Sequence, residues 1–419
     1  MSAPKPTPQE PGAKGPGSAP GGVFAKYAHL RDTRSQMLHA SPRDPFNVVI
    51  EKPLSASEGV IEGRPTLLFG TNNYLGMSQS TPAREKAQAV ARSMGVGTTG
   101  SRIANGTFSL HAQLEQRLAK LFGRKHAMVF STGYQANLGT ISALVNKDDI
   151  LFLDADCHAS IYDGAKLSGA RVIRFRHNDP ADLEKRLKRS AHESGARLVV
   201  IEGIYSMTGN VAPVKRFAEV CKANGAALMV DEAHSFGVLG ENGRGAAELD
   251  GCEGEVDFIV GTFSKSLGTV GGYCVTDHDD IDLMRLVSRP YMFTASLPPE
   301  IVAATLATID DVEAKPELRA QLRANAAQLH GGLRAAGLKT GEHPSPVVAV
   351  TLDDIPQALA FWNGLLEAGV YVNLSLPPAT PDNFPLLRCS VSAAHTPAQI
   401  EKAIAAFAQV GKAVGAIKA

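Results

Sequence analysis

The sequence predicts an α/β fold in which a mostly parallel sheet is covered by helices and is followed by a smaller α+β domain. Two patterns predict this fold. Between about residues 66 and 300, short apolar runs typical of buried strands alternate with helical patterns. After residue 300, long helical segments come before short strands. Crossovers join strands that alternate with helices, so neighbouring strands run parallel and helices lie on both faces of the sheet.

The first 65 residues carry two further segments. Residues 1–22 hold six prolines, five glycines and only three charges, so they bury too little apolar surface to repay the entropy of ordering. We expect a disordered tail there. Residues 23–65 combine a helical pattern at Phe24, Tyr27 and Leu30 with a proline-rich turn near residue 43, and we expect an N-terminal arm.

The large domain is expected over residues 66–300. A helical pattern at Arg84–Met94 comes early in it, and others at Leu183–Ala191 and Lys215–Asn224 lie between strands. Six apolar runs predict the strands, namely Ala127–Phe130, Ile150–Asp154, Val172–Phe175, Leu198–Glu202, Ala227–Asp231 and Phe258–Gly261. In such a sheet, ligands bind beyond the carboxyl ends of the strands. Chemistry is therefore expected where these runs end.

The C-terminal α+β domain is expected over residues 301–419. Two helices and three strands are predicted in the order Pro299–Ala314, Pro316–Ala336, Pro346–Leu352, Tyr371–Leu374 and Leu386–Val391. A last helix is predicted because Ile400, Ile404, Phe407 and Val410 share one helical face.

The composition argues against several classes of protein. Lys plus Arg and Asp plus Glu both number 42, so the chain lacks the basic excess that bulk binding to nucleic acid or to an anionic membrane requires. The five cysteines form no C-x-x-C pair and are odd in number, which favours neither a disulfide framework nor a zinc site. Apolar runs of 18 residues and an apolar signal core are absent. We expect a cytoplasmic protein without a metal and with at most peripheral membrane contact.

Two strings resemble nucleotide-binding motifs but stand in the wrong context. Gly95–Gly100 fits G-x-G-x-x-G, yet the pattern before it is helical, whereas a dinucleotide site needs a strand there. Asp231–His234 spells a helicase box, but the sequence has no G-x-x-x-x-G-K-[ST] loop to hold a phosphate. Nucleotide binding is therefore disfavoured, and the absence of G-x-S-x-G disfavours an α/β-hydrolase.

Three features fall where predicted strands end. Ser131–Tyr134 follows a strand and precedes a helical run, and small residues at a helix N-terminus suit a phosphate. Asp231, with His234 three residues on, follows four apolar residues, where a carboxylate is costly unless a positive group meets it. Lys265 stands among Ser, Thr and Gly just after a strand, and such an amine can form a Schiff base with an aldehyde.

Each feature also has an ordinary structural interpretation: a plain tight turn, a buried aspartate with a structural partner, and a solvated lysine. Jointly they match pyridoxal 5′-phosphate (PLP), which needs an amine for its aldehyde, an anion for its ring nitrogen and N–H donors for its phosphate. The 34-residue spacing from Asp231 to Lys265 is consistent with two strand ends of one sheet. A carboxylate near the ring nitrogen is worth about 4 kcal/mol at an effective dielectric near 20, which favours the protonated ring. The three features together therefore predict a PLP site.

With these motifs the sequence resembles the α-oxoamine synthases, a family of PLP enzymes of fold type I that join an amino acid to an acyl thioester. The resemblance covers about residues 44–415. Its marks are Asn73–Gly76, Gly100–Arg102, Phe130–Tyr134, Asp156, His158–Ser160, Asp231–Ser235, Gly261–Lys265 and Thr294–Pro299. The resemblance implies the fold type I architecture, a large PLP-binding domain with a smaller C-terminal domain, and a homodimer with shared active sites.

The resemblance also implies roles for single residues. Lys265 would bind the PLP aldehyde and then act as the acid–base lysine, His158 would stack on the ring, and Asp231 would pair with the ring nitrogen. Further cofactor contacts are implied at His234, Gly133, Tyr134, Thr262, Ser264 and, from the other subunit, Thr294. Substrate contacts are implied at Arg388, Asn72 and Ser101. Arg388 would hold the substrate carboxylate, for which bidentate geometry suits arginine, although the residues alone favour a surface charge on a strand there.

Within the family, the sequence is most similar to the bacterial serine palmitoyltransferase branch, through Asn105–Phe108, Arg289–Thr294 and Tyr371–Asn373. That branch implies a decarboxylating condensation of L-serine with a long-chain acyl thioester, palmitoyl-CoA or an acyl carrier protein thioester, to 3-ketosphinganine, the first step of sphingolipid synthesis. One position departs, because relatives carry Arg where this chain has Leu376. The alternatives are 8-amino-7-oxononanoate synthase (alanine), 2-amino-3-ketobutyrate CoA ligase (glycine) and a non-catalytic PLP homologue acting as a partner subunit.

Overall fold

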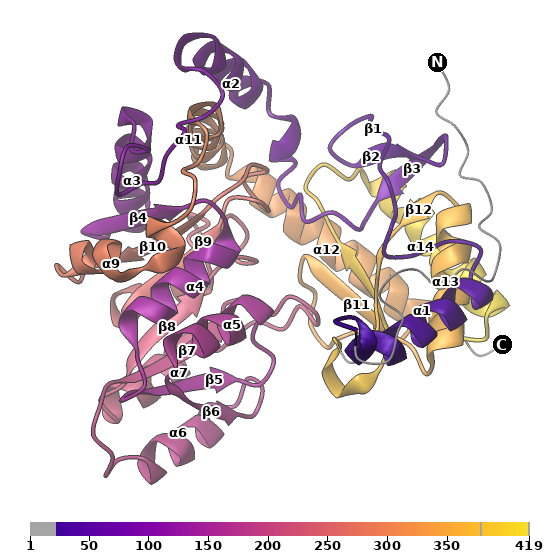
Figure 1. Ribbon diagram of the computed structural model, residues 1–419. Helices are drawn as coiled ribbons and strands as arrows, with labels where there is room; N and C mark the ends of the chain where they lie inside the picture. Colours follow the sequence, from indigo (N-terminus) through magenta and orange to yellow (C-terminus); the bar gives the residue numbers. More distant parts are fainter. Residues whose placement is uncertain (1–21, 378, 418–419) are drawn as a thin grey trace. The chain divides into compact units, whose positions relative to one another are not determined.

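The computed structural model describes residues 22–377 and 379–417 (Figure 1). The chain divides into two compact units, Met1–Val48 and Val49–Ala419. The tail predicted at residues 1–22 lies outside the described residues, except for its last glycine.

The smaller unit holds the start of the predicted arm. A short 3-10 helix, η1 (Ala25–Tyr27), leads into α1 (Ala28–Ala40). Arg34 Nη2 donates to Asp44 Oδ2 at 2.6 Å, and the Phe46 N–H donates to Asp44 Oδ1 at 3.0 Å. These two bonds hold the turn that the sequence predicts near residue 43. From residue 49 on, the predicted arm belongs to the larger unit and forms strands.

The larger unit is built on a seven-stranded sheet with the strand order β4-β10-β9-β8-β7-β5-β6. Its strands are β4 (His126–Phe130), β5 (Ile150–Asp154), β6 (Arg171–Phe175), β7 (Arg197–Glu202), β8 (Ala227–Asp231), β9 (Phe258–Thr262) and β10 (Gly272–Thr276). β10 runs antiparallel to β4 and β9, and the other neighbours pair in parallel. The mostly parallel sheet confirms the predicted fold class. The six predicted strands are present, and β10 is an additional one.

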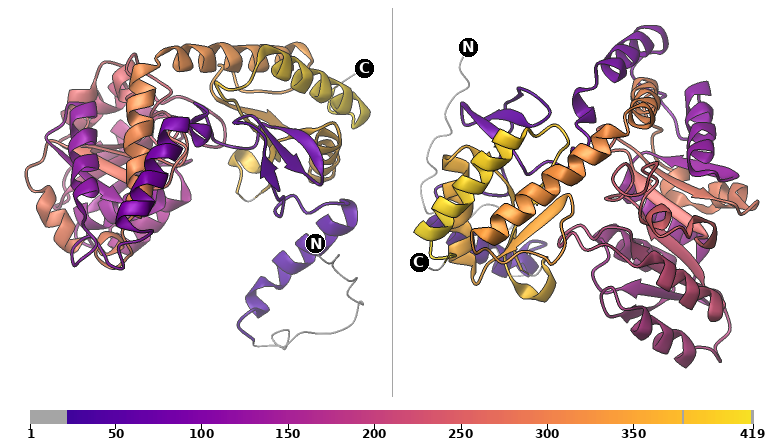
Figure 2. Two further views of the ribbon diagram at one scale, coloured as in Figure 1. Left: turned by 90° about the horizontal axis from the view of Figure 1, so that it is seen from above. Right: turned by 180° about the vertical axis from the view of Figure 1, so that it is seen from behind.

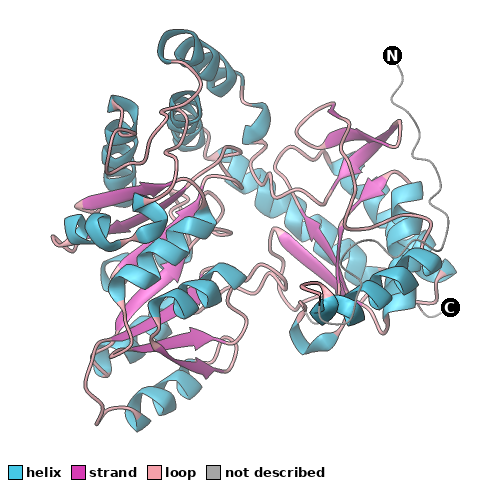
Figure 3. Ribbon diagram, viewed as in Figure 1, coloured by secondary structure: helices cyan, strands magenta, loops and turns pink. Residues whose placement is uncertain are grey.

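Helices flank this sheet (Figure 3). They are η2 (Met77–Gln79), α2 (Thr81–Met94), α3 (Ser109–Phe122), α4 (Gly133–Leu144), α5 (Ala159–Ser168), α6 (Pro180–Arg189), α7 (Val214–Ala223), α8 (Ala246–Leu249), η3 (Glu253–Glu255), α9 (Ile281–Val287), α10 (Arg289–Met292) and α11 (Pro299–Ala314). α4 and α5 pack together and share one core with the sheet through Ile141, Leu153 and Val200, which are all fully buried. α3 contacts β4 and β10, and α7 contacts β8. This burial fixes α4 and α5 beside the carboxyl ends of the strands.

Two small sheets complete the larger unit. One has the order β1-β2-β3-β12 and the other β11-β14-β13. The remaining elements are β1 (Lys52–Pro53), β2 (Glu58–Ile61), β3 (Arg64–Leu68), α12 (Glu317–Ala335), β11 (Val347–Thr351), α13 (Ile355–Glu367), β12 (Val370–Tyr371), β13 (Asn373–Ser375), η4 (Pro381–Asn383), β14 (Leu386–Ser390) and α14 (Pro397–Ala413). α12 and α14 lie side by side (Figure 2). The predicted strand at Tyr371–Leu374 is two strands, because β12 pairs with β3 and β13 pairs with β14.

The predicted boundary at residue 300 falls at the start of α11. This helix contacts α2 and α3, whereas α12 contacts β11 and α14. The division into a large and a C-terminal domain stays a prediction, since residues 49–419 group as one compact unit.

Strand pairing brings distant residues to one edge of the large sheet. Glu202, the last residue of β7, pairs with Asp231, the last residue of β8. Gly272, the first residue of β10, pairs with Thr262 at the end of β9 and with Phe130 at the end of β4. The three features that the sequence analysis found after β4, β8 and β9 therefore lie at the same edge.

Candidate active site

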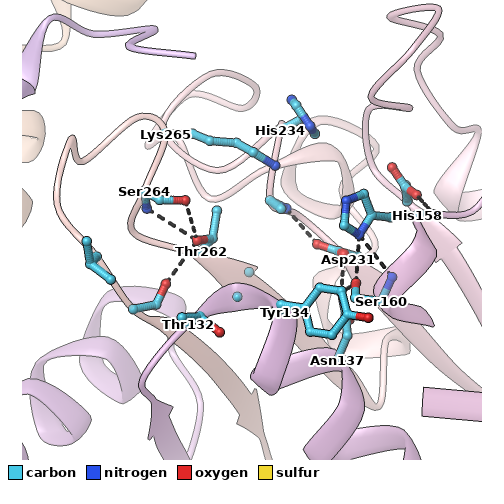
Figure 4. A pocket seen from close by; sticks show the side chains of 16 residues that line it. Thr132, Tyr134, Asn137, His158, Ser160, Asp231, His234, Thr262, Ser264 and Lys265 are labelled. Atoms are coloured by element: carbon cyan, nitrogen blue, oxygen red, sulfur yellow. Dashed lines mark hydrogen bonds between the residues drawn. The ribbon is translucent and has the colours of Figure 1, made fainter. Parts of the chain in front are cut away.

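A cavity of about 290 Å³ opens at this edge of the sheet, which is near the usual lower size of small-molecule sites. Its lining residues are Thr132, Gly133, Tyr134, Asn137, His158, Ser160, Glu202, Asp231, Ala233, His234, Gly261, Thr262, Ser264, Lys265, Val270 and Gly271. In Figure 4, Lys265 reaches across the cavity toward His158, His234 and Asp231, while Thr132, Thr262 and Ser264 lie at the other end. The cavity thus has an end with ionisable groups and an end with hydroxyls.

Asp231 lies at the ionisable end and is held from two sides. Its Oδ1 accepts the Ala233 N–H at 2.8 Å, and its Oδ2 accepts from Asn137 Nδ2 at 2.7 Å. Its side chain is 4% exposed. Next to it, burial and the Asp231 charge raise the pKa of Glu202 well above its usual range. Burial therefore favours the neutral form of Glu202 beside the hydrogen-bonded carboxyl group of Asp231.

Lys265 projects its amine from the turn after β9. The pKa of Lys265 is lowered to about 8, chiefly by burial; Asp231 and Glu202 act in the opposite direction, and the Arg388 charge contributes a smaller lowering. A lysine with such a pKa has an appreciable fraction of neutral amine at neutral pH, and only the neutral amine attacks an aldehyde. The environment of Lys265 thus suits a nucleophile.

Two histidines flank this amine. His158 caps α5 and lines the cavity, and desolvation lowers its pKa below the usual value. His234 is buried, its Nδ1 shares a 2.6 Å hydrogen bond with the Tyr74 hydroxyl, and burial followed by the nearby charge of Lys265 lowers its pKa strongly. Both imidazoles are therefore neutral at pH 7 and present one N–H donor each.

The hydroxyl end is built from backbone that approaches closely. A Cβ on Gly133 would lie 2.6 Å from the Thr262 Cβ, and one on Gly272 would lie 2.6 Å from the Thr132 carbonyl oxygen. Thr132 caps α4 by accepting the Gln135 N–H at 3.1 Å. Thr262 Oγ1 shares a 2.8 Å hydrogen bond with Ser264 Oγ. The start of α4 thus faces the cavity with free N–H groups and hydroxyls beside it, which is a favourable site for a phosphate.

Arg388 is buried, so the interpretation as a surface charge, which its residue type alone favoured, is wrong. It stands in β14 and is 8% exposed. Arg388 Nε donates to the Ser206 carbonyl oxygen at 2.6 Å, and Nη2 donates to Asn72 Oδ1 at 3.0 Å. Asn72 also accepts from Ser390 Oγ at 2.9 Å. Arg388 is not a lining residue, but its charge lowers the pKa values of Lys265 and His234, so it lies close to the cavity.

Three other predicted residues are placed differently from the group around Lys265. The Ser101 carbonyl oxygen accepts from the Gly106 N–H in a loop, and Ser101 does not line the cavity. Thr294 Oγ1 accepts from Gln135 Nε2 at 3.1 Å outside the lining. Tyr134 lines the cavity but its hydroxyl donates to Asp163.

Sequence analysis missed three polar residues that line the cavity: Asn137, Ser160 and Glu202. Glu202 follows four apolar residues at the end of β7, which is the same signal that singled out Asp231. Asn137 lies inside a helix and carries no such signal, and Ser160 was only one letter of a longer motif.

The cavity fits PLP on these observations. An amine (Lys265), a buried carboxyl group (Asp231) and a helix start with hydroxyl groups beside it (Gly133, Thr262 and Ser264) line this cavity together, and they are the three parts that the cofactor requires. Over residues 22–377 and 379–417, no cluster of His, Cys, Asp or Glu side chains is arranged to bind a metal ion. In the same described segments, no helix has the length and apolar character needed to span a membrane.

Comparisons with known proteins agree with this geometry. Residues 64–407 match the family Aminotransferase class I and II. The chain is 56% identical over 397 residues to the serine palmitoyltransferase of Caulobacter vibrioides, covering 95% of this chain and 98% of that protein. It is 41% identical over 364 residues to the 8-amino-7-oxononanoate synthase of Geobacter metallireducens, covering 86% and 93%. A solved structure of SPT with the PLP internal aldimine superimposes with a TM-score of 0.92 at 48% identity, covering 94% of this chain and all of that one.

Proposed function

Because the chain belongs to the Aminotransferase class I and II family, we propose that it condenses L-serine with a long-chain acyl thioester such as palmitoyl-CoA and releases CO2 and the thiol. The product is 3-ketosphinganine. The chain is a PLP-dependent acyltransferase, and its closer similarity to serine palmitoyltransferase than to 8-amino-7-oxononanoate synthase favours serine over alanine.

PLP, when bound, supplies an aldehyde for amines and a ring that accepts the electrons released at the α-carbon. The chain supplies the rest. Lys265 would hold the cofactor aldehyde through Nζ, and a pKa near 8 would suit the released amine to take the α-proton of serine. Asp231 holds the ring nitrogen in its protonated form by its charge. Gly133, Thr262 and Ser264 hold the phosphate together with the first N–H groups of α4.

The substrates are bound by residues near the end of the cavity that holds the ionisable groups. Arg388 binds the serine carboxylate, because it is a buried guanidinium close to Lys265. Asn72 keeps Arg388 in place through the 3.0 Å hydrogen bond. His158 and His234 would hold the cofactor ring from the cavity lining, and the N–H of His158 would stabilise the negative charge that develops on the thioester carbonyl oxygen.

The enzyme is proposed to act as a cytoplasmic homodimer in which Thr294 reaches the partner's phosphate. Leu283, Leu286, Val287 and Phe293 are exposed apolar residues just before Thr294, which favours a second copy of the chain as their cover. All five cysteines are buried free thiols, which fits a reducing compartment.

The observation that carries the proposed function is the meeting of Lys265 and Asp231 in one cavity in a chain this similar to a serine palmitoyltransferase. The test is a product panel. Purified PLP-loaded enzyme is incubated with serine, alanine or glycine and with acyl thioesters of several chain lengths, carried on CoA or on acyl carrier protein. The masses of the products are measured by mass spectrometry.

We expect the mass of a long-chain 3-ketosphinganine from serine alone. A dominant alanine or glycine product would assign the chain to a sister activity, and the absence of any condensed product with bound PLP would favour a non-catalytic homologue.

A further inference from the structure

We propose that Asn137 and Ser160 are positioning residues that fix the tautomer of His158, with its proton on Nε2, and tie that choice to Asp231. The tautomer is argued from the geometry and does not depend on the proposed function, whereas its consequence for catalysis rests on that function.

The orientation of the Asn137 amide is set by its charged neighbour. Asn137 is 3% exposed on α4, and its Nδ2 lies 2.7 Å from Asp231 Oδ2 and 2.9 Å from Ser160 Oγ. A carboxylate only accepts hydrogen bonds, so the group facing it must be the NH2 end of the amide. That nitrogen has two hydrogens and no acceptor capacity, and each hydrogen has one partner here. Ser160 Oγ therefore accepts from Asn137.

The Ser160 hydroxyl also forms a hydrogen bond with His158, and the direction of that bond can be assigned. Ser160 is fully buried, and its single hydroxyl hydrogen is free for another acceptor. Its Oγ lies 2.7 Å from His158 Nδ1. Oγ keeps a second lone pair after it accepts from Asn137, so it donates to Nδ1 where that nitrogen carries no proton. The backbone decides that this is the case. The Ser160 N–H points at the same nitrogen from 3.2 Å, and a backbone N–H can only donate.

His158 Nδ1 therefore faces two donors and carries no proton. A neutral imidazole keeps one N–H, which must then be at Nε2. Desolvation lowers the pKa of His158 and keeps it neutral, although the Asp231 charge acts against this. The opposite tautomer would set two N–H groups against each other at Nδ1 and leave the Ser160 amide without its acceptor.

The consequence is a donor with a fixed direction. Nδ1 is turned to Ser160, so Nε2–H is the only ring donor left for a thioester carbonyl oxygen. The same chain of bonds, Asp231 to Asn137 to Ser160 to His158, couples the position of the ring-nitrogen anion to that of the donor. Asp231 is the last residue of β8 and His158 is the residue that caps α5, so both are anchored to elements at the sheet edge, which keeps their spacing rigid.

The test reads the tautomer directly in the PLP-loaded enzyme. Protein labelled with 15N at histidine gives nitrogen shifts that separate the two tautomers and the cation, and the His158 signals are identified by their loss in His158→Gln. Wild type is expected to show a neutral ring protonated at Nε2. Ser160→Ala and Asn137→Leu are expected to shift His158 toward a mixture of tautomers, in which the Nε2–H form stays the major one in Ser160→Ala because the residue 160 N–H still donates to Nδ1. The control is Ser142→Ala, since Ser142 lies on α4 with Asn137 and its Oγ donates to the Leu138 carbonyl oxygen at 2.6 Å, away from His158.

Kinetics add a second readout that a general loss of stability would not give. Ser160→Ala should lower kcat about tenfold, a partial loss of a general-acid contribution, with KM for serine within about twofold of wild type. A wild-type ring protonated at Nδ1, or unchanged His158 shifts in Ser160→Ala, would overturn the proposal, and Ser160→Ala decides the matter if Asn137→Leu does not fold. If the enzyme shows the expected tautomer but makes no ketone product, the proposed function is wrong. The positioning role of Asn137 and Ser160 would still hold in that case.

Discussion

Charged groups are buried in two regions of the larger unit, and the regions hold them by different means. At the edge of the seven-stranded sheet, Asp231 ends β8 and is bound by the N–H of Ala233, two residues further on. In the three-stranded sheet, Arg388 stands inside β14 and is held by Ser206 and Asn72, which are 182 and 316 residues away in the sequence. The charge at the strand end is stabilised in part by the next turn, with Asn137 of α4 as its second partner, whereas both partners of the charge inside the strand are distant in the sequence. We infer that the first region carries the chemistry and the second binds the substrate.

The largest expected effect comes from Asp231→Asn. Loss of a charge worth about 4 kcal/mol at an effective dielectric near 20 corresponds to about a 10³-fold lower kcat. Steady-state kinetics with serine and palmitoyl-CoA, at saturating PLP, measure this. An effect on KM for serine alone would contradict the division of labour between the two regions.

The neighbouring carboxylate offers a matched control. Glu232 accepts the N–H groups of Ala246 and Ala247 at 2.9 and 3.0 Å and does not line the cavity. Burial raises the pKa of Glu232 to about 7. Glu232→Gln should lower the free energy of unfolding by about 1–3 kcal/mol, since one acceptor is replaced by a donor. Its kcat per folded molecule should match wild type.

Arg388→Lys tests the second region. Lysine keeps the charge but loses the bidentate contact, and a charge-assisted hydrogen bond is worth about 1.5–3 kcal/mol, so KM for serine should rise about 10- to 100-fold while kcat changes less. Arg334→Lys, on an exposed part of α12, is the control and should leave KM unchanged. A fall in kcat at constant KM would place Arg388 in the chemistry instead.

The two regions should also act on Lys265 in opposite directions. With a pKa of about 8, the neutral amine of apoenzyme becomes scarcer below pH 8, so the rate of PLP binding should fall about tenfold per pH unit there and level off above it. The Asp231 charge raises this pKa and the Arg388 charge lowers it. Stopped-flow absorbance should show the midpoint moving down in Asp231→Asn and up in Arg388→Gln. If the pH midpoint of the PLP-binding rate is unchanged in both variants, the two regions do not act on Lys265 in opposite directions.

A smaller effect is expected at the phosphate end. In Gly133→Ala the new Cβ would lie 2.6 Å from the Thr262 Cβ, and the required shift costs about 1 kcal/mol or more, or about fivefold in PLP affinity. Titration of apoenzyme with PLP measures it. Gly254→Ala is the control, because a Cβ there meets no atom within 4 Å. Equal affinities in both variants would remove Gly133 from the phosphate site.

The same comparison explains what could be predicted from the sequence. Asp231 directly follows an apolar run and Lys265 comes three residues after β9 ends, so a local pattern reveals both the strand and the group near its end. Glu202 carries that signal too and was passed over. Arg388 has no local signal, because its burial depends on Asn72 and Ser206; only the family resemblance pointed to it.

Elements missed by the sequence analysis have a similar cause. β10 begins at Gly272 within a glycine-rich stretch that gives no strand pattern, and the strand is stabilised by burial and by pairing with β4 and β9 on its two sides. β1–β3 are short and partly exposed, and β3 is completed by pairing with β12 some 300 residues later, which no local pattern shows.

The most direct measurement of the central claim is to locate the bond between enzyme and cofactor. PLP-loaded enzyme is reduced with sodium borohydride, digested, and mapped by mass spectrometry, with Lys265→Ala as the control. The account predicts the added mass of the reduced cofactor on Lys265 in wild type and on no peptide in Lys265→Ala. A label on another lysine, or none on fully active enzyme, would contradict it.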